Sequence, residues 1–218
     1  LNSSGAVPLL SRPGPGHGFA TATSETALPP GVQSSNRQVC SSLIFCQSIR
    51  SLVWGNHALP LYWEVLPQRG NSDLKTQKRL LKAVLPLFKN YPVLVLGDRE
   101  FHSPKLAAWL DAKGFAFVLR QKKDLHFRAP GETEYQVVKD LDIRPGMRQF
   151  YPAVACNKGD GLGPFNLAVY WQRRYRGQGP KAPWYILTNL SEVKQVMAIY
   201  RCRWGIEQLF KDCKTGGY

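Results

Sequence analysis

Two carboxylates, Asp98 and Glu207, stand at positions where proteins commonly place reactive groups. Asp98 closely follows the apolar run at residues 92–96, and open α/β sheets place reactive groups at the carboxyl ends of their strands. Glu207 lies far along the chain on a predicted helix that can face the same sheet edge. Mg²⁺ and Mn²⁺ require oxygen ligands, and paired metal ions stabilise both the attacking and the leaving oxygen of a phosphodiester. These residues therefore indicate metal-dependent phosphoryl transfer on nucleic acid.

The helix that carries Glu207 also places Tyr200, Arg203 and Lys214 on one stripe about 60° wide, taking 100° per residue. Beside a metal-bound phosphate, Arg203 and Lys214 would hold phosphate oxygens. Tyr200 would stack on a base or bond to a phosphate. A simpler interpretation stays open, in which Arg203 and Glu207 form an ordinary i,i+4 pair on a solvated face and Asp98 only closes a turn.

The chain is strongly basic, which favours a polyanionic partner, nucleic acid first and an anionic membrane second. Its 218 residues carry a net charge of +14. One basic cluster with a neighbouring aromatic comprises Arg173, Arg174 and Arg176 around Tyr175, and another spans residues 120–123. Both suit phosphate contacts and stacking, although solvated loops would look the same. Glu100, two residues after Asp98, could support the site as a further acid behind the metal ligands, but we expect it to point to solvent.

Cysteine usage and hydropathy narrow the setting of the protein. The five cysteines are irregularly spaced without a C-x-x-C, so a zinc site has little support and a reduced cytoplasmic protein fits best. No apolar run approaches the ~18 residues of a membrane span, and no secretory leader opens the sequence. We therefore expect a cytoplasmic protein with no membrane contact.

Residues 1–50 differ in kind from the rest, because 19 of them are Ser, Gly or Pro. We interpret this part as low-complexity or disordered, with residues 39–45 as its one short strand candidate. Residues 51–218 read as an ordered domain with a β-rich insertion at about 121–180. The predicted elements are hairpin strands at 51–55 and 58–65, a helix capped by Ser72 or Asp73 and ended or kinked by Pro86, a strand at 92–96, a helix capped by Ser103 and ended by Gly114, a strand at 115–119, the insertion, a strand at 184–187, and a helix from Ser191 to about Lys214.

This order predicts a mixed α/β core. The unbroken apolar run at 92–96 is typical of a strand buried on both faces. Trp54, Trp63 and Trp109 lie in apolar patterns and are expected in the core.

A sequence pattern in the last helix adds a family to this interpretation. Tyr200, two residues, Arg203, three residues, Glu207, six residues and Lys214 reproduce a motif with fixed spacing. The pattern resembles the YREK signature of the DDE transposases of bacterial insertion sequences. The segment 93–101 around Asp98 is similar to the second-aspartate strand of the same family, and residues 51–60 are similar to its hairpin. The resemblance covers about 51–218.

The resemblance implies an RNase H-like domain with a β insertion before its last catalytic helix. It implies DNA transposition by metal-dependent phosphodiester cleavage and strand transfer, with a two-metal Mg²⁺ or Mn²⁺ site. Asp98 and Glu207 would be catalytic metal ligands, and Tyr200, Arg203 and Lys214 would contact DNA. The implied partner is double-stranded DNA at terminal inverted repeats, bound by a homodimer in a synaptic complex.

The sequence departs from that family at the position of the first catalytic aspartate. That residue should precede the hairpin, but no Asp occurs before Asp73 and residues 39–50 contain no acid. Relatives also continue beyond residue 218. We therefore expect a truncated or frameshifted copy with an incomplete core and impaired or no catalysis. The alternatives are a non-catalytic DNA-binding fragment that modulates a full-length transposase, and an unrelated RNase H-like nuclease.

Overall fold

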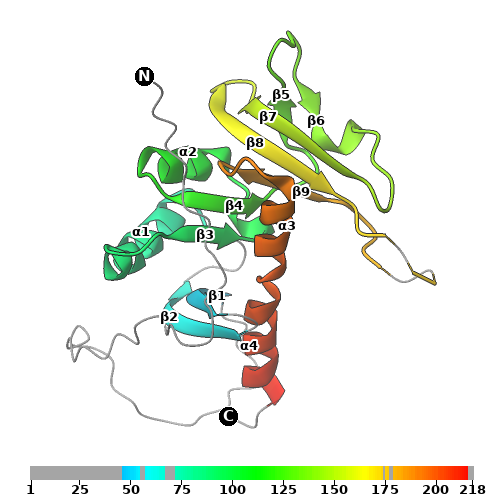
Figure 1. Cartoon of the computed structure of the whole chain (residues 1–218). Coiled ribbons are helices and arrows are strands. Elements are labelled where there is room, and N and C mark those ends of the chain that lie inside the picture. Colours follow the sequence, from blue (N-terminus) through cyan, green and yellow to red (C-terminus); the bar gives the residue numbers. More distant parts are fainter. Residues whose placement is uncertain (1–45, 55–56, 67–71, 174, 177–178, 216–218) are drawn as a thin grey trace, which may run out of the picture. The chain divides into compact units, whose positions relative to one another are not determined.

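The computed structural model describes residues 46–54, 57–66, 72–173, 175–176 and 179–215 (Figure 1). All of them belong to one compact unit, Ile44–Tyr218. The strand expected at 39–45 and nearly all of the low-complexity segment lie outside the described residues. The first described strand begins at Cys46, which is five residues earlier than the sequence predicts.

The strands form two sheets within the described residues. A hairpin of β1 (Cys46–Trp54) and β2 (His57–Leu66) makes a two-stranded antiparallel sheet. The other sheet has seven strands in the order β3-β4-β9-β8-β7-β5-β6. Its members are β3 (Leu94–Gly97), β4 (Ala116–Arg120), β5 (His126–Arg128), β6 (Gln136–Val137), β7 (Arg148–Cys156), β8 (Leu162–Tyr170) and β9 (Trp184–Thr188). Only β3 and β4 are parallel, so the sheet is mixed.

Helices cover the seven-stranded sheet on both faces. The helices α1 (Leu74–Val84) and α2 (Pro104–Ala112) pack on one face, in a core that includes Leu106, Phe117 and Leu187. The helix α3 (Val193–Arg201) packs on the other, against Val118 and Ile186 (Figure 1). The last helix α4 (Trp204–Thr215) contacts the hairpin β1–β2. Short 3₁₀ turns complete the list: η1 (Leu85–Phe88), η2 (Arg99–Phe101) and η3 (Val138–Asp140).

Local sequence explains where the first two helices begin and end. Asp73 caps α1, since its side chain accepts a hydrogen bond from the Thr76 backbone N–H at 2.8 Å. Pro86 stops the α-helix, because it has no N–H to donate, and the chain continues as η1. Gly114 follows α2 with a φ of +74°, a conformation that glycine adopts without strain. The Ser103 side chain, by contrast, makes no capping bond.

Two expectations about the elements need correction. The strand β3 is half-buried rather than buried on both faces, because it stands at the edge of the seven-stranded sheet with β4 as its one partner in the described chain. The helix predicted from 191 to 214 is two helices, with a turn at Cys202 and Arg203 between them. The β insertion continues the main sheet, since β8 pairs with β9 over five residue pairs.

Candidate active site

Asp98 stands where β3 leaves the sheet. Leu94 and Leu96 pack on the α3 side of the sheet, so the alternation of an extended strand directs Asp98 to that same side. Its carboxylate is exposed, and one oxygen, Oδ1, accepts a hydrogen bond from the Glu100 backbone N–H at 3.0 Å. The second oxygen makes no hydrogen bond to any described residue. Asp98 is thus oriented through one oxygen and available through the other.

A buried polar network ties the turn after Asp98 to the start of α1. The Gln77 side chain is 2 % exposed and donates from Nε2 to the Ser72 carbonyl at 2.9 Å and to the Glu100 carbonyl at 3.0 Å. The Glu100 carboxylate accepts from the backbone N–H and the hydroxyl of Ser72. We expected Glu100 to face solvent, and this was wrong because Ser72, 28 residues earlier, supplies two donors to it.

The Tyr200 ring belongs to the core of the α3 face. It is 1 % exposed and packs edge to face on Trp184, with ring centroids 4.9 Å apart. A buried ring has no free face for a base, so the arrangement leaves Tyr200 only its hydroxyl for a polar role. That hydroxyl lies 3.5 Å from Nη1 of Arg120, the last residue of β4. Because β3 and β4 are parallel neighbours, Arg120 and Asp98 leave the sheet at the same edge.

Arg203 joins these parts to Glu207. Its guanidinium donates to Glu207 Oε1 at 2.5 Å and lies over the Tyr200 ring, 5.7 Å from the centroid. Burial acts to lower the pKa of Arg203, but Tyr200, Glu207 and Asp98 outweigh it and the pKa is raised. Asp98 follows β3 at the point where Arg120 ends the parallel neighbour β4, and Arg120 contacts Tyr200. The structure brings together Asp98, Tyr200, Arg203 and Glu207, four residues that the sequence singled out.

Two guanidinium nitrogens in this cluster have no acceptor among the described residues. They are the Nε atoms of Arg120 and Arg203, and both are buried. A buried donor without a partner is costly, and the cost is largest for a charged group.

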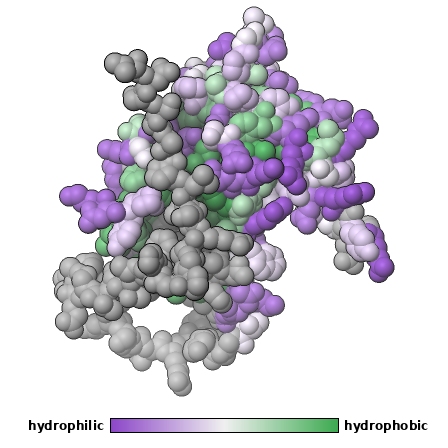
Figure 2. Space-filling view, viewed as in Figure 1, coloured by the Kyte–Doolittle hydropathy of each residue, from purple (hydrophilic) through white to green (hydrophobic). Residues whose placement is uncertain are grey.

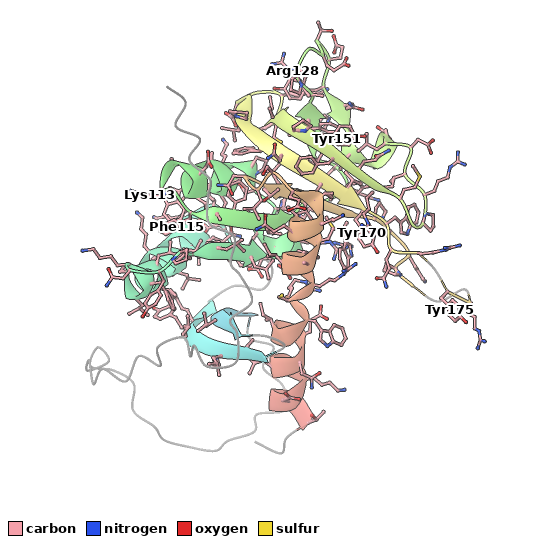
Figure 3. The ribbon with its side chains drawn as sticks, in the orientation of Figure 1. Lys113, Phe115, Arg128, Tyr151, Tyr170 and Tyr175 are labelled. Carbon is pink, nitrogen blue, oxygen red and sulfur yellow. The ribbon has the colours of Figure 1, made fainter. Side chains whose placement is uncertain are left out.

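Other predicted residues lie outside the cluster. Arg173, Tyr175 and Arg176 belong to the β8–β9 connection, and Figure 3 shows Tyr175 at the end of a loop that extends away from Tyr170. Tyr175 is 74 % exposed, with the Arg176 guanidinium 5.3 Å from its ring centroid. Lys214 lies in α4, but its side chain is not among those described, and Arg174 is outside the described residues.

The chain matches the family model of the transposase DDE domain over residues 45–218. It belongs to the DDE transposase family. Its mixed sheet with flanking helices is the RNase H-like fold of that domain, so the predicted α/β fold is confirmed. A search among proteins of curated function finds no match. In the described part of this DDE domain, no helix has the length and apolar character that a membrane span requires.

DDE domains generally use divalent metal ions, which makes the ligand set of this one informative. Asp98 and Glu207 each have one oxygen bonded, to the Glu100 backbone N–H and to Arg203, and one oxygen without a hydrogen bond among the described residues. Among the described residues no group of three or more His, Cys, Asp or Glu side chains could hold a metal ion. Two carboxylates, one of them ion-paired, do not fit a site for two metal ions.

Sequence reasoning missed two arginines of this DDE domain near the cluster. Arg148 and Arg201 lie over the ring of Tyr170, with guanidinium carbons 5.5 and 5.8 Å from its centroid. Tyr170 in turn packs on Trp184, with centroids 5.7 Å apart. Arg201 is next to Tyr200 in sequence, so the motif that contains Tyr200 could have pointed to it. Arg148 begins β7 and had no local signal, because the pairing of β7 with β8 is what brings it to Tyr170.

Proposed function

We propose that this chain is a transposase-type protein that binds double-stranded DNA. The binding site in this proposal is the arginine cluster, which comprises Arg120, Arg203 and the Tyr200 hydroxyl with the nearby Arg148 and Arg201. We further propose that the chain's own catalysis is impaired or absent. The observation that carries DNA binding is the gathering of four guanidinium groups, those of Arg120, Arg148, Arg201 and Arg203, around the side chains of Tyr170 and Tyr200. A backbone phosphate supplies oxygens of the charge that guanidinium groups bind.

Impaired catalysis follows from the ligand set. Phosphodiester cleavage by two metal ions needs carboxylates that share the ions, and Arg203 holds the Glu207 carboxylate at 2.5 Å. The expected first aspartate has no counterpart before Asp73. We therefore propose Asp98 and Glu207 as the remaining two of the three acids, with Mg²⁺ or Mn²⁺ as the ion that an intact relative would use.

The finer assignments extend the family match. We infer the YREK subfamily from the spacing of Tyr200, Arg203, Glu207 and Lys214, and we infer terminal inverted repeats as the DNA and a homodimeric synaptic complex as the assembly. Lys214, Arg173, Arg174 and Arg176 are further DNA contacts in this proposal. We propose a cytoplasmic location.

The alternative is a non-catalytic DNA-binding fragment that modulates a full-length transposase. The same ion pair favours it, because Arg203 neutralises Glu207 without removing the basic cluster. Addition of the purified chain to an active relative's cleavage reaction would then slow that reaction by competition for DNA ends.

A binding and cleavage experiment on one preparation tests the proposal. Anisotropy of a labelled duplex, measured across a salt series, should show binding whose log affinity falls linearly with log salt concentration. The double variant Arg120→Gln, Arg203→Gln should weaken binding and flatten that slope by about two. Supercoiled plasmid incubated with Mg²⁺ or Mn²⁺ should remain intact. Nicking that Asp98→Ala abolishes would show an active enzyme, and a salt-independent affinity would exclude phosphate binding.

A further inference from the structure

A second surface, separate from the arginine cluster, lies on the face of the sheet that α1 and α2 cover. A groove of about 470 Å³ opens where η1 meets the turn between α2 and β4. Its walls are largely apolar and aromatic, with Leu85, Phe88, Tyr91, Trp109 and Phe115 among the lining residues. Figure 3 labels Phe115 in this region, beside Lys113. The sequence predicted Trp109 in the core, but the structure leaves it half-buried in the groove wall.

Two large apolar side chains of this region are exposed. Leu87, in the same 3₁₀ turn as Leu85 and Phe88, is 66 % exposed, and Tyr91, which lines the groove, is 47 % exposed. Exposed apolar side chains that gather on a protein surface mark interaction sites more often than isolated ones do. We therefore expect an apolar occupant in the groove.

Lysines border the groove. Lys82, Lys89 and Lys113 line it, and the Lys78 ammonium lies 5.9 Å from the centre of the Trp109 ring. None of these four lysines is in a salt bridge among the residues that the structure describes. The described residues that line the groove include no Asp or Glu. Figure 2 shows hydrophilic side chains beside hydrophobic ones across the face it displays. The rim is therefore positively charged and unneutralised.

The nearest acid in sequence to Lys113 is already engaged. Asp111 accepts a hydrogen bond from the Asn189 side-chain amide at 2.9 Å, which holds it toward β9. On α1, Lys75, Lys78 and Lys82 fall on one stripe at i, i+3 and i+7. A bound helix with Asp or Glu side chains at the same spacing could pair them with these lysines.

We propose that this groove binds an acidic amphipathic helix of another protein, with the apolar face of the helix in the groove and its Asp and Glu side chains on the lysine rim. An amphipathic helix binds in such a groove by inserting its apolar side chains, while its charged side chains contact the rim. Rim charges of opposite sign raise the association rate and exclude basic partners.

Other occupants fit the same surface less well. Duplex DNA would pair with the lysines but would leave Leu85, Leu87 and Phe88 without apolar contact. Residues 1–45 of the chain contain a single acid, Glu25, so that segment lacks the charges for the rim. A second copy also fits less well, because its helix α4 carries two acids and one of them, Glu207, is already paired with Arg203.

The test uses a fluorescein-labelled peptide of about 14 residues, four helical turns, with Leu and Trp on one face and Glu on both flanks. Saturable binding is expected, and a peptide of the same composition with its apolar residues scattered should bind at least tenfold more weakly. The variant Lys82→Glu, Lys113→Glu should weaken binding at least tenfold and should bind a peptide carrying Lys in place of Glu at least tenfold better than wild type does. Tyr91→Ala should weaken binding several-fold without a change of charge.

The control variant Lys139→Glu, Lys158→Glu makes the same change in net charge at exposed positions elsewhere and should bind the peptide like the wild type. Equal weakening by the control, equal binding of the scattered peptide, or no saturation at about 1 mM peptide would overturn the proposal. A duplex that loses affinity for the Lys82→Glu, Lys113→Glu variant and keeps it for the control would identify DNA as the occupant instead. None of these outcomes depends on the arginine cluster, so this proposal and the proposed function can fail separately.

Discussion

Two buried glutamines allow a matched test of how the turn after Asp98 is held. Gln77 and Gln121 are each 2 % exposed, and the side-chain oxygen of each is buried without a hydrogen-bond partner among the described residues. They differ in what their amide nitrogens reach. Gln77 donates to Ser72 and Glu100 in three contacts of 2.9 to 3.3 Å, whereas Gln121 donates once, to the Leu119 carbonyl two residues away. Leucine substitution at each position therefore isolates the long-range bonds.

The magnitude follows from these bonds. Each hydrogen bond contributes about 1 kcal/mol net to the free energy of unfolding. Each leucine substitution also removes a buried amide oxygen that has no partner, and the stability gained from this is similar in the two variants. The Gln77 amide has two N–H groups, so its three contacts amount to two full hydrogen bonds, one more than Gln121 makes. Gln77→Leu should therefore be less stable than Gln121→Leu by about 1 kcal/mol. For a domain of this size that difference lowers the midpoint of thermal unfolding by about 2–4 °C.

Urea unfolding followed by tryptophan fluorescence gives the free-energy difference, and hydrogen exchange reports on the turn itself. The Glu100 amide, which donates to Asp98 Oδ1, should exchange faster in Gln77→Leu and at the wild-type rate in Gln121→Leu. Equal stability of the two variants, together with unchanged exchange at Glu100, would refute the claim that Gln77 holds this turn.

The remaining predictions concern packing, pH and DNA. Trp184→Ala should cost about 3 kcal/mol in urea unfolding, because its ring packs between those of Tyr170 and Tyr200, whereas Tyr200→Phe should cost under 1 kcal/mol. Burial raises the pKa of the Cys156 thiol to about 12 from an ordinary 9.0. The unfolded chain therefore loses this proton at a lower pH than the folded chain does. The free energy of unfolding is unaffected by this thiol below pH 9 and falls by about 1.4 kcal/mol per pH unit between pH 9 and about 12. Cys156→Ala should remove that part of the slope in alkaline unfolding titrations, and an unchanged slope would exclude Cys156 as its source. Arg201→Ala should reduce the salt slope of duplex binding by about one, and an unaltered slope would mean that Arg201 makes no phosphate contact.

Local signals were sufficient for most elements of the fold. Asp73 as a cap, Pro86 as a helix stop and Gly114 after α2 act within a few residues of themselves, so the sequence predicts them. The half-burial of β3 depends on which strands stand beside it, and no property of Leu94 or Leu96 encodes that.

The break between α3 and α4 also had no clear local signal. No proline precedes it, and the turn is stabilised by i→i+3 bonds from Gly205 to Cys202 and from Ile206 to Arg203. A continuous helix was the reasonable prediction, because Tyr200, Arg203 and Glu207 keep helical spacing. The break did not separate them, since Arg203 still contacts both of the others.

The contacts between site residues that belong to one sequence motif could be predicted. The contacts between residues that the folding of the sheet brings together could not. Arg203 and Glu207 follow from spacing alone. The contact of Arg120 with Tyr200 joins residues 80 apart, and the bond of Ser72 with Glu100 joins residues 28 apart. Such contacts depend on strand order and helix placement, which composition and periodicity leave open.

Loss of cleavage with retention of DNA binding is tested by a plasmid assay with the purified chain in Mg²⁺ and in Mn²⁺, with DNA binding measured on the same samples. We expect salt-sensitive binding that Arg120→Gln, Arg203→Gln weakens, and plasmid that remains supercoiled throughout. Metal-dependent nicking that disappears in Asp98→Ala would contradict the claim of impaired catalysis. Binding that neither salt nor the double substitution reduces would contradict the claim that this cluster holds DNA.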